Sequence, residues 1–181
     1  KLDNQASQVV GKNKSGEGQL GADIQIGNSV INFLTDKRVP IIVYSEEKVK
    51  PVTILHNSIE ESPLYVGILD DLDGSSVFKS QRGTGRYGTM FAIFKGLDPK
   101  YEDWLSCGVM EHSPKPRLFI AYKGQGAFLF NGKEAITHNK KQRIRVSNKT
   151  QLESAFIYSD EYFEVNHLSG ERLRSKGYKC H

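Results

Sequence analysis

The apolar residues near the start of the chain follow a helical period. Four of them fall on one stripe of a predicted helix, namely Ile26, Val30, Ile31 and Leu34. Asp23 precedes this stripe and suits a helix N-cap, so we expect the helix to begin near Asp23 and to end before Pro40. Residues 1–20 are polar and show no period after Val10, which predicts a mobile loop.

Further along, short apolar runs separated by Gly, Pro and polar residues predict strands. The runs cover residues 41–44, 52–55, 64–69, 89–94, 107–110, 117–122, 126–130, 142–146 and 154–159. Residues 123–126 and 131–133 have the composition of hairpin turns, and such short connections predict an antiparallel meander. A polar segment with helical character follows, up to Arg174. The fold class is therefore α+β, a helix layered on an antiparallel sheet of about six strands.

Two of the predicted strands end in acidic residues. Those acids are Glu46 and Glu47 after the first strand, and Asp70, Asp71 and Asp73 after the run 64–69. Strands that each end in carboxylates can bring both groups to one edge of a sheet, which is the arrangement a metal site needs. A solvated strand end remains an alternative for the two glutamates.

The residues after the aspartates favour phosphate chemistry. Gly74 and Ser75 are expected to form a turn whose backbone N–H groups could hold an anion. Hard oxygen ligands beside such a turn suggest Mg²⁺-assisted chemistry on a phosphate. Two alternatives stay open, namely a solvated turn for the acidic segment and a helix cap without any catalytic role for Asp23.

A glycine pattern follows the acidic segment, but it does not indicate a dinucleotide site. Gly83, Gly85 and Gly88 match G-x-G-x-x-G letter for letter. That fingerprint needs a strand before it and a helix after it, whereas here polar residues precede it and the predicted strand 89–94 follows. We therefore interpret the glycines as a loop between strands.

Composition narrows the class of protein. A chain of 181 residues with 38% hydrophobic and 25% charged residues is expected to form one globular domain. Cys107 and Cys180 lie far apart and predict free thiols, and the sequence contains neither a membrane span nor a secretory pattern, so we expect a cytoplasmic protein. The net charge of +4 is modest, and the basic clusters have few aromatics among them, which argues against a nucleic-acid partner.

Four pieces of the sequence together resemble one known family. In chain order they are Asp23, the pair Glu46-Glu47, the segment 70–75 (DDLDGS) and the segment 123–132 (KGQGAFLFNG). They are similar to the motifs of the inositol monophosphatase and fructose-1,6-bisphosphatase superfamily. That family has a strand ending in Glu-Glu, then D-P-[IL]-D-G-[ST], then a G-x-G-A-[FW]-x-N-G hairpin. The resemblance implies an inositol-monophosphatase-like fold and extends over most of the chain.

The resemblance also implies a metal site. By position, Glu46, Asp70 and Asp73 correspond to the carboxylate ligands of Mg²⁺, and Leu72 to the residue that contributes a backbone carbonyl. Two or three Mg²⁺ ions are expected on this basis.

The remaining implied roles concern the substrate and the attacking water. Gly74 and Ser75 correspond to residues that bind the substrate phosphate through backbone N–H groups. The Ser75 hydroxyl and Asp23 correspond to the pair that orients and activates the water, with Glu47 as a supporting acid. No covalent enzyme intermediate is required.

The sequence departs from the family pattern at two places. Asp71 occupies the position of the motif's Pro, which leaves open whether Asp70 or Asp71 is the first ligand. The family also has a further Asp ligand near its C-terminus in a Trp-Asp motif, whereas Trp104 is followed by Leu105 here. We therefore expect residues 1–181 to be the metal-binding, N-terminal domain of a longer phosphatase. The C-terminal half of that phosphatase is expected to be missing from this sequence.

These observations predict an enzyme. We expect a Mg²⁺-dependent phosphomonoesterase that hydrolyses a small phosphorylated sugar, a polyol of the inositol phosphate or fructose bisphosphate type, or a nucleotide, by metal-activated water. The alternative is a catalytically degenerate relative that acts as an anion-binding or interaction module. A small phosphorylated metabolite is the expected partner, a homodimer stays open, and no nucleic acid or membrane is expected.

Overall fold

The computed structural model describes residues 5–13, 16, 18–55, 63–81, 84–112, 115–148, 171–172 and 174–176. The chain divides into two compact units, Lys1–Ile144 and Arg145–His181. In the second unit, Glu171, Arg172, Arg174 and Ser175 are helical. The predicted strand 154–159 lies outside the described residues. Within the described ranges, no helix is both long and apolar enough to cross a membrane.

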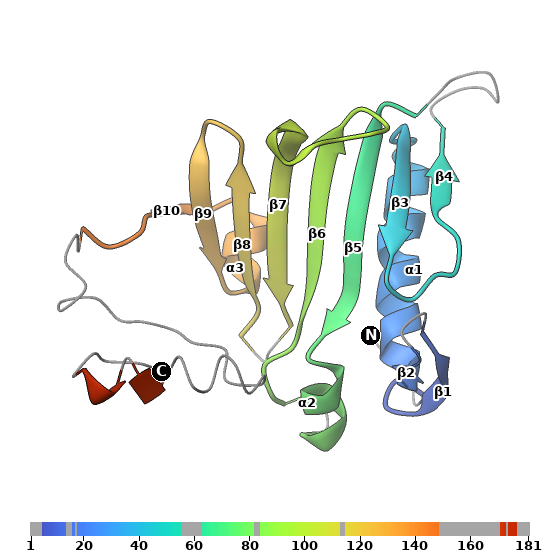
Figure 1. Cartoon of the computed structure of the whole chain (residues 1–181), viewed down its shortest axis with the longest axis horizontal. Coiled ribbons are helices and arrows are strands. Elements are labelled where there is room, and N and C mark those ends of the chain that lie inside the picture. Colours follow the sequence, from blue (N-terminus) through green and yellow to red (C-terminus); the bar gives the residue numbers. More distant parts are fainter. Residues whose placement is uncertain are drawn as a thin grey trace. The chain divides into compact units, whose positions relative to one another are not determined.

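The first unit is built on one eight-stranded sheet, coloured from cyan to orange in Figure 1. Its strands lie in the order β10-β9-β8-β7-β6-β5-β3-β4. In chain order they are β3 (Ile41–Ser45), β4 (Val52–Ile54), β5 (Tyr65–Asp73), β6 (Gly88–Lys95), β7 (Trp104–Glu111), β8 (Arg117–Tyr122), β9 (Gly126–Asn131) and β10 (Gln142–Ile144). A short 3₁₀ turn, Tyr101–Asp103, precedes β7.

The sheet is mixed, whereas an antiparallel sheet of about six strands was expected. The meander from β5 to β10 is antiparallel, as the short connections predicted. β3 and β5, however, pair in parallel, with Ile41 opposite Tyr65 and Ser45 opposite Leu69. The reason is that β4 lies between them in the chain and runs antiparallel to β3, so it returns the chain to the end of the sheet at which β3 begins.

The N-terminal segment is not wholly a loop. Val9–Lys12 (β1) and Gly18–Leu20 (β2) form a small antiparallel sheet of their own. The prediction of a loop over 1–20 is therefore wrong for these residues. All four residues of β1 are exposed, so no alternation of buried and exposed positions marks this strand in the sequence.

The predicted helix is confirmed as α1, Gly21–Asp36. Ile31 and Leu34 are buried in a core with Ile41, Val43, Ile54 and Leu69, so the apolar stripe packs on the sheet as its period predicts. A second core joins Leu72 to Leu20, Ala22 and Phe78 near the start of α1. Together these cores attach α1 to β3 and β5.

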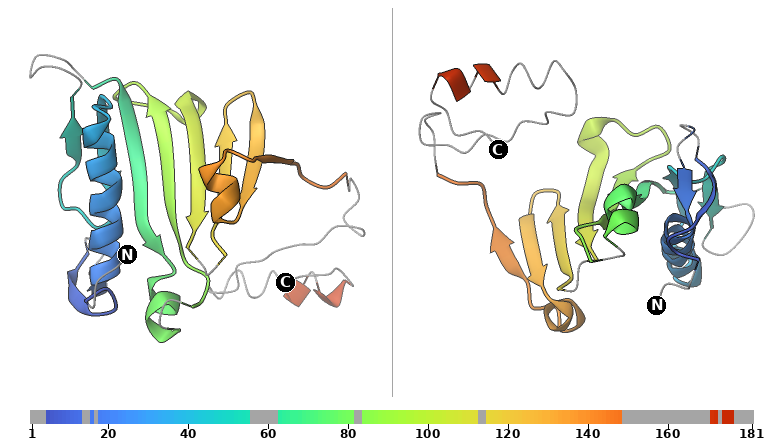
Figure 2. Two further views of the ribbon diagram at one scale, coloured as in Figure 1. Left: turned by 180° about the vertical axis from the view of Figure 1, so that it is seen from behind. Right: turned by 90° about the horizontal axis from the view of Figure 1, so that it is seen from below.

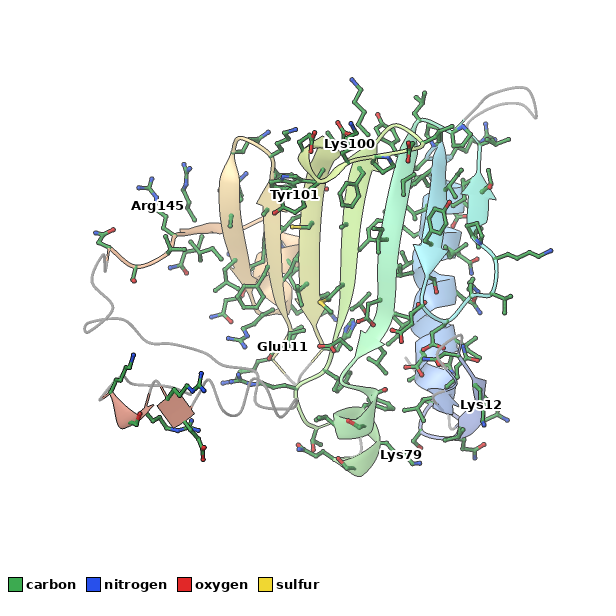
Figure 3. The ribbon with its side chains drawn as sticks, in the orientation of Figure 1. Lys12, Lys79, Lys100, Tyr101, Glu111 and Arg145 are labelled. Atoms are coloured by element: carbon green, nitrogen blue, oxygen red, sulfur yellow. The ribbon has the colours of Figure 1, made fainter. Side chains whose placement is uncertain are left out.

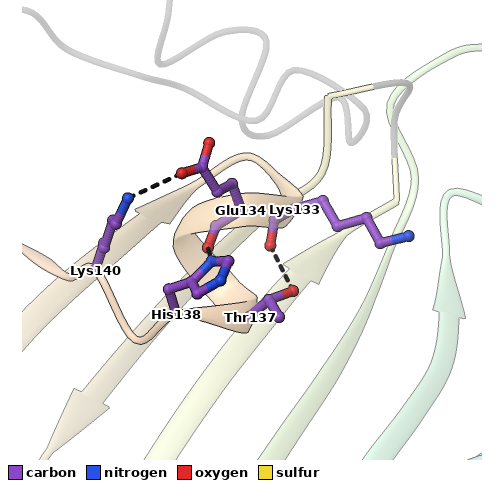
Figure 4. Close-up of polar contacts among 5 residues, drawn as sticks. All are labelled: Lys133, Glu134, Thr137, His138 and Lys140. Carbon is purple, nitrogen blue, oxygen red and sulfur yellow. Dashed lines mark hydrogen bonds and ion pairs between the residues drawn. The ribbon is translucent and has the colours of Figure 1, made fainter.

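The segment after β9 is not a hairpin turn, contrary to the prediction for residues 131–133. Gly132 instead leads into the short helix α3, Lys133–Thr137. Figure 4 shows its contacts: Thr137 Oγ1 donates to the Lys133 carbonyl at 2.9 Å, and Lys140 Nζ pairs with Glu134 Oε1 at 2.9 Å. The other predicted turn, residues 123–125, does join β8 to β9.

The two faces of the sheet differ. Helices α1 and α3 lie on the same face, which is nearest the viewer in the left panel of Figure 2. Side chains on the opposite face, called here the open face, include Tyr44, Ile68, Met90 and Val109, all of them exposed. Their register across β3, β5, β6 and β7 puts them on one surface.

Candidate functional site

The parallel pairing of β3 and β5 brings the two groups of acids together. Both strands run toward the same end of the sheet, and the backbone N–H of Glu46 donates to the Leu69 carbonyl at 3.2 Å. The prediction that the two acid-bearing strands meet at one sheet edge is confirmed. In Figure 3, Lys12 and Lys79 lie at this end of the sheet, while Lys100 and Tyr101 lie at the opposite end.

Strand β5 does not stop where the acids begin. It continues through Asp73, and its pairing with β6 shifts register between Asp70 and Asp73. Such an irregularity is a β-bulge, which bends a strand and redirects its side chains. The acidic segment is thus a bulged strand end and not the solvated turn that was its alternative reading, and the chain turns at Gly74, where the turn was predicted; the φ of Gly74 is 83°.

Alternation along β5 separates the neighbouring aspartates. Asp70 is half-buried and borders a hollow of about 410 Å³ on the open face, together with Ile68 and Met90. Asp71 points the other way, toward α1, and is 1% exposed. Among the two candidates for the first ligand, Asp70 is therefore the one that faces the accessible side.

Leu72 and Asp73 complete the acidic segment. The Leu72 side chain is buried in the second core, so only its backbone is available to a ligand. Asp73 is exposed beside the bulge. The segment thus offers carboxylates at its two ends and anchors itself through Leu72 between them.

Asp23 is the third residue of α1 and not its N-cap, which is Leu20. Its Oδ2 accepts the Leu20 N–H at 2.6 Å, so it does cap the helix, from inside the first turn. Its Oδ1 is buried without a hydrogen-bond partner, and the residue is 2% exposed. A buried acceptor of this kind costs roughly 1–3 kcal/mol unless something occupies it. Capping and ligand binding are therefore compatible roles, one for each oxygen.

The two glutamates receive hydrogen bonds from residues near the small N-terminal sheet. Asn13 Nδ2 donates to Glu46 Oε1 at 3.2 Å, and Gln19 Nε2 donates to Glu47 Oε2 at 2.6 Å. Sequence reasoning missed Asn13 and Gln19 because their segment was read as a loop. No motif marks them, since a lone amide side chain carries no spacing signal.

The acids raise one another's pKa values. Burial, then repulsion from Glu46, Asp73 and Asp71, raises the pKa of Asp70 to about 6. Burial, then repulsion from Asp23, raises the pKa of Glu47 to about 7 despite the hydrogen bond from Gln19. Burial also raises the pKa of Asp23. The site therefore concentrates negative charge that a cation would neutralise.

Gly74 and Ser75 stand at the start of α2, Ser75–Ser80. Gly74 adopts the left-handed conformation, which lets β5 turn directly into this helix. No hydrogen bond joins Ser75 to Asp23, both of which the structure describes, so the predicted pairing of these residues in water activation stays a prediction. Of the glycine pattern, Gly85 lies outside helices and strands and Gly88 begins strand β6, as expected for a loop and not for a dinucleotide fingerprint, while Gly83 lies outside the described residues.

The donor set suits a hard cation. It consists of carboxylate oxygens, including the unpartnered Asp23 Oδ1, and such ligands match Mg²⁺ in type. Within the described ranges, no three His, Cys, Asp or Glu side chains converge closely enough to form a ready metal site. The identity and number of the ions therefore remain predictions, as do the individual ligands.

Comparison with known proteins establishes the fold. The chain is similar to a crystal structure of Leishmania major fructose-1,6-bisphosphatase, with a TM-score of 0.68 and 15% identity over 98% of this chain and 59% of that one. It is also similar to a Toxoplasma gondii protein assigned as a sedoheptulose-1,7 bisphosphatase, with a TM-score of 0.67 and 16% identity over 96% of this chain and 58% of that one. No protein-family model and no curated protein matches the sequence.

The chain thus shares the fold of these two structures, as the motif resemblance implied. It spans less than three fifths of the length of these two structures. At such low identity the likeness concerns the fold alone, and the chemistry has to be argued from the residues at the β3 and β5 ends.

Proposed function

We propose that this chain carries the metal-binding part of a Mg²⁺-dependent phosphomonoesterase. One observation carries the proposal: acids from two strands and a helix meet at one end of the sheet, where burial and then mutual repulsion raise the pKa values of Glu47 and Asp70. A fold shared with sugar bisphosphatases supports a phosphorylated sugar as substrate, and a phosphorylated polyol or a nucleotide fits the same chemistry.

In this proposal Glu46, Asp70 and Asp73, with the Leu72 carbonyl, would hold Mg²⁺. The bound ion would supply charge neutralisation at the phosphoryl oxygens and lower the pKa of a coordinated water. Gly74 and Ser75 would bind the phosphate through the backbone at the start of α2. The bulge in β5 lies between two of these acids, Asp70 and Asp73, and Gly74 follows Asp73 directly.

Two further acids would handle the proton of the attacking water. Glu47, with a pKa of about 7, is suited to accept a proton near neutral pH at Oε1, because Gln19 occupies Oε2. The hydrogen bond from the Leu20 N–H to Oδ2 holds the Asp23 side chain in place, and its Oδ1 has no hydrogen-bond partner among the described residues. With Ser75 it would orient the water for attack on phosphorus.

The test is phosphate release from a panel of sugar bisphosphates, sugar monophosphates, inositol phosphates and nucleotides, with Mg²⁺ and with EDTA. Release that requires Mg²⁺ and is abolished by Asp70→Asn supports the proposal. Ile54→Val is a suitable control, since Ile54 is buried in the α1 core and is not among the proposed site residues. Release that persists in EDTA or in Asp70→Asn contradicts it.

A second measurement concerns the proposed pairing of Asp23 with Ser75. Asp23→Asn and Ser75→Ala should each lower kcat, and the double variant should be scarcely slower than either, because residues that act as a unit are non-additive. Additive losses would mean that the two residues act separately.

A degenerate relative that binds an anion or a partner is the second candidate. The lack of a converged three-residue metal cluster among the described side chains favours it. Mg²⁺ binding without phosphate release from any substrate in the panel would select this candidate.

A further inference from the structure

Asp71 makes buried contacts that serve none of the roles proposed above. Its Oδ2 accepts a hydrogen bond from the Ser45 hydroxyl at 2.6 Å, and Ser45 is itself only 4% exposed. The Ser45 oxygen in turn accepts the backbone N–H of Glu47 at 3.1 Å. Two hydrogen bonds thus connect the side chain of Asp71 on β5 to the backbone that carries the acids after β3.

Two more elements fix Asp71 from other directions. On β6, Thr89 Oγ1 donates to the Asp71 carbonyl at 2.9 Å. On α1, the absence of a side chain at Gly27 makes room for the carboxylate, because a Cβ there would lie 1.6 Å from Asp71 Oδ1. Asp71 therefore contacts three elements besides its own strand.

We propose that Asp71 is a positioning residue that holds the ends of β3 and β5 together, and so sets the spacing between the pair 46–47 and Asp70 and Asp73. The catalytic consequence rests on the function proposed above. The positioning itself rests only on the contacts of Asp71, Ser45 and Gly27.

The direction of the side chain argues against a role as metal ligand. Although β5 is bulged between Asp70 and Asp73, the side chains of Asp70 and Asp71 have surroundings on opposite faces of the sheet. Asp70 borders the hollow on the open face, whereas Asp71 ends against Gly27 inside the layer between sheet and helix. Asp71 stands at the motif's Pro position, and Pro has no side-chain acceptor for the Ser45 hydroxyl. The carboxylate therefore adds a cross-strand bond that the motif lacks.

The experiment compares Asp71→Asn, Asp71→Ala and Ser45→Ala with the control Ile54→Val. Calorimetry with Mn²⁺ alone measures metal affinity, and amide hydrogen exchange in the metal-free protein measures order at the ends of β3 and β5. Asp71→Ala and Ser45→Ala should each weaken Mn²⁺ binding by roughly 10–100-fold, as loss of support behind metal ligands commonly does. The double variant should be no weaker than either single variant.

Asp71→Asn separates positioning from metal ligation. Asn keeps an oxygen for the Ser45 hydroxyl, so affinity for Mn²⁺ should stay close to the wild-type value. An affinity as low as that of Asp71→Ala would mean that Asp71 is a ligand, and the proposal would be wrong. If Ser45→Ala does not fold, this comparison of the two Asp71 variants decides the question.

The exchange measurement is independent of the enzyme activity. Faster exchange at Glu47 and at residues 70–73 in Asp71→Ala, but not in Ile54→Val, supports the positioning role even if the wild-type protein binds no Mn²⁺ and releases no phosphate. That pair of negative results would overturn the proposed function only. Unchanged exchange in Asp71→Ala would overturn the positioning role.

Discussion

Isoleucines on the two faces of the sheet differ in their exposure to solvent. Ile41 on β3 faces α1 and is 0% exposed, whereas Ile68 on the neighbouring β5 faces the open side and is 52% exposed. Both are isoleucines in paired strands, so the difference comes from what covers each face. On the α1 face the helix covers β3 and β5 and buries a core, whereas nothing among the described residues covers Ile68 on the open face.

The same division separates two of the acidic residues. Asp70 belongs to the open face and Asp71 to the α1 face, although they are adjacent in sequence. The face that a carboxylate occupies thus decides whether it borders the accessible hollow or packs against α1.

The largest effect is expected on the α1 face, from Ile41→Ala. Ile41 is fully buried with Ile31 and Leu34 of α1, and truncation of such a side chain costs about 2–5 kcal/mol. Urea unfolding monitored by circular dichroism measures the loss. A cost well under that range would mean that α1 packs loosely and that the two faces are alike.

A smaller but more specific effect is expected from Gly27→Ala. In an ordinary helix this change is favourable by roughly 0.5–1 kcal/mol. Here the new Cβ would lie 1.6 Å from Asp71 Oδ1, so we expect a loss of about 1–3 kcal/mol in urea unfolding.

The matched background for Gly27→Ala is Asp71→Ala. Without the carboxylate, the nearest remaining atom of residue 71 is Cβ at 3.5 Å, an ordinary contact. Gly27→Ala should therefore be neutral or stabilising in this background. An equal loss in both backgrounds would show that Asp71 is not what Gly27 accommodates.

The pH dependence of the free energy of unfolding, measured on the metal-free protein, tests the crowding of acids at the ends of β3 and β5. The pKa of Glu47 rises from 4.5 to about 7 on folding, so the folded state binds more protons than the unfolded state in this interval. The free energy of unfolding should therefore fall as the pH increases from 4.5 to about 7. Glu47→Gln should flatten this slope in urea titrations with EDTA. A free energy that rises over the interval would contradict the crowding of acids.

The smallest effect is expected on the open face, from Ile68→Ala. A half-exposed side chain away from special contacts changes the free energy of unfolding by no more than about 0.5 kcal/mol. The same urea assay compares it with Ile41→Ala. A cost as large as that of Ile41→Ala would show that something covers the open face in solution.

Periodicity predicted much of the fold. The run 117–122 coincides with β8, and 41–44 and 89–94 each lie within the strands found, because apolar strand residues signal burial directly. The apolar stripe of α1 was also predicted. These elements share long apolar patterns, which are visible without knowledge of their partners.

The end of β5 could not be predicted in this way. Acidic residues have low strand propensity, so the sequence indicates a strand that stops at Leu69. Pairing with β6, where Asp70 lies opposite Met90 and Asp73 opposite Gly88, supplies the hydrogen bonds that extend it. This tertiary pairing overrides the local preference.

The candidate site was predictable in its residues more than in their roles. The motif resemblance identified the acids, but the roles of Asp71, Ser45 and Gly27 depend on three elements that meet only in the folded chain. Nothing in the separations of Ser45 and Gly27 from Asp71, 26 and 44 positions, indicates contact. Asp23 shows the same limit, since its place as third residue of the helix depends on where α1 begins.

The fit of Gly27 against Asp71 has a consequence for how this sequence can change over evolutionary time. An Asp at position 71 requires a glycine at position 27 and a hydroxyl at position 45, whereas a Pro at position 71 removes both requirements. Homologues should therefore show correlated substitutions at these three positions: Gly and Ser where residue 71 is acidic, and larger helix-forming residues at position 27 where it is Pro. A set of homologues would display the coupling as a statistical signature across alignment columns.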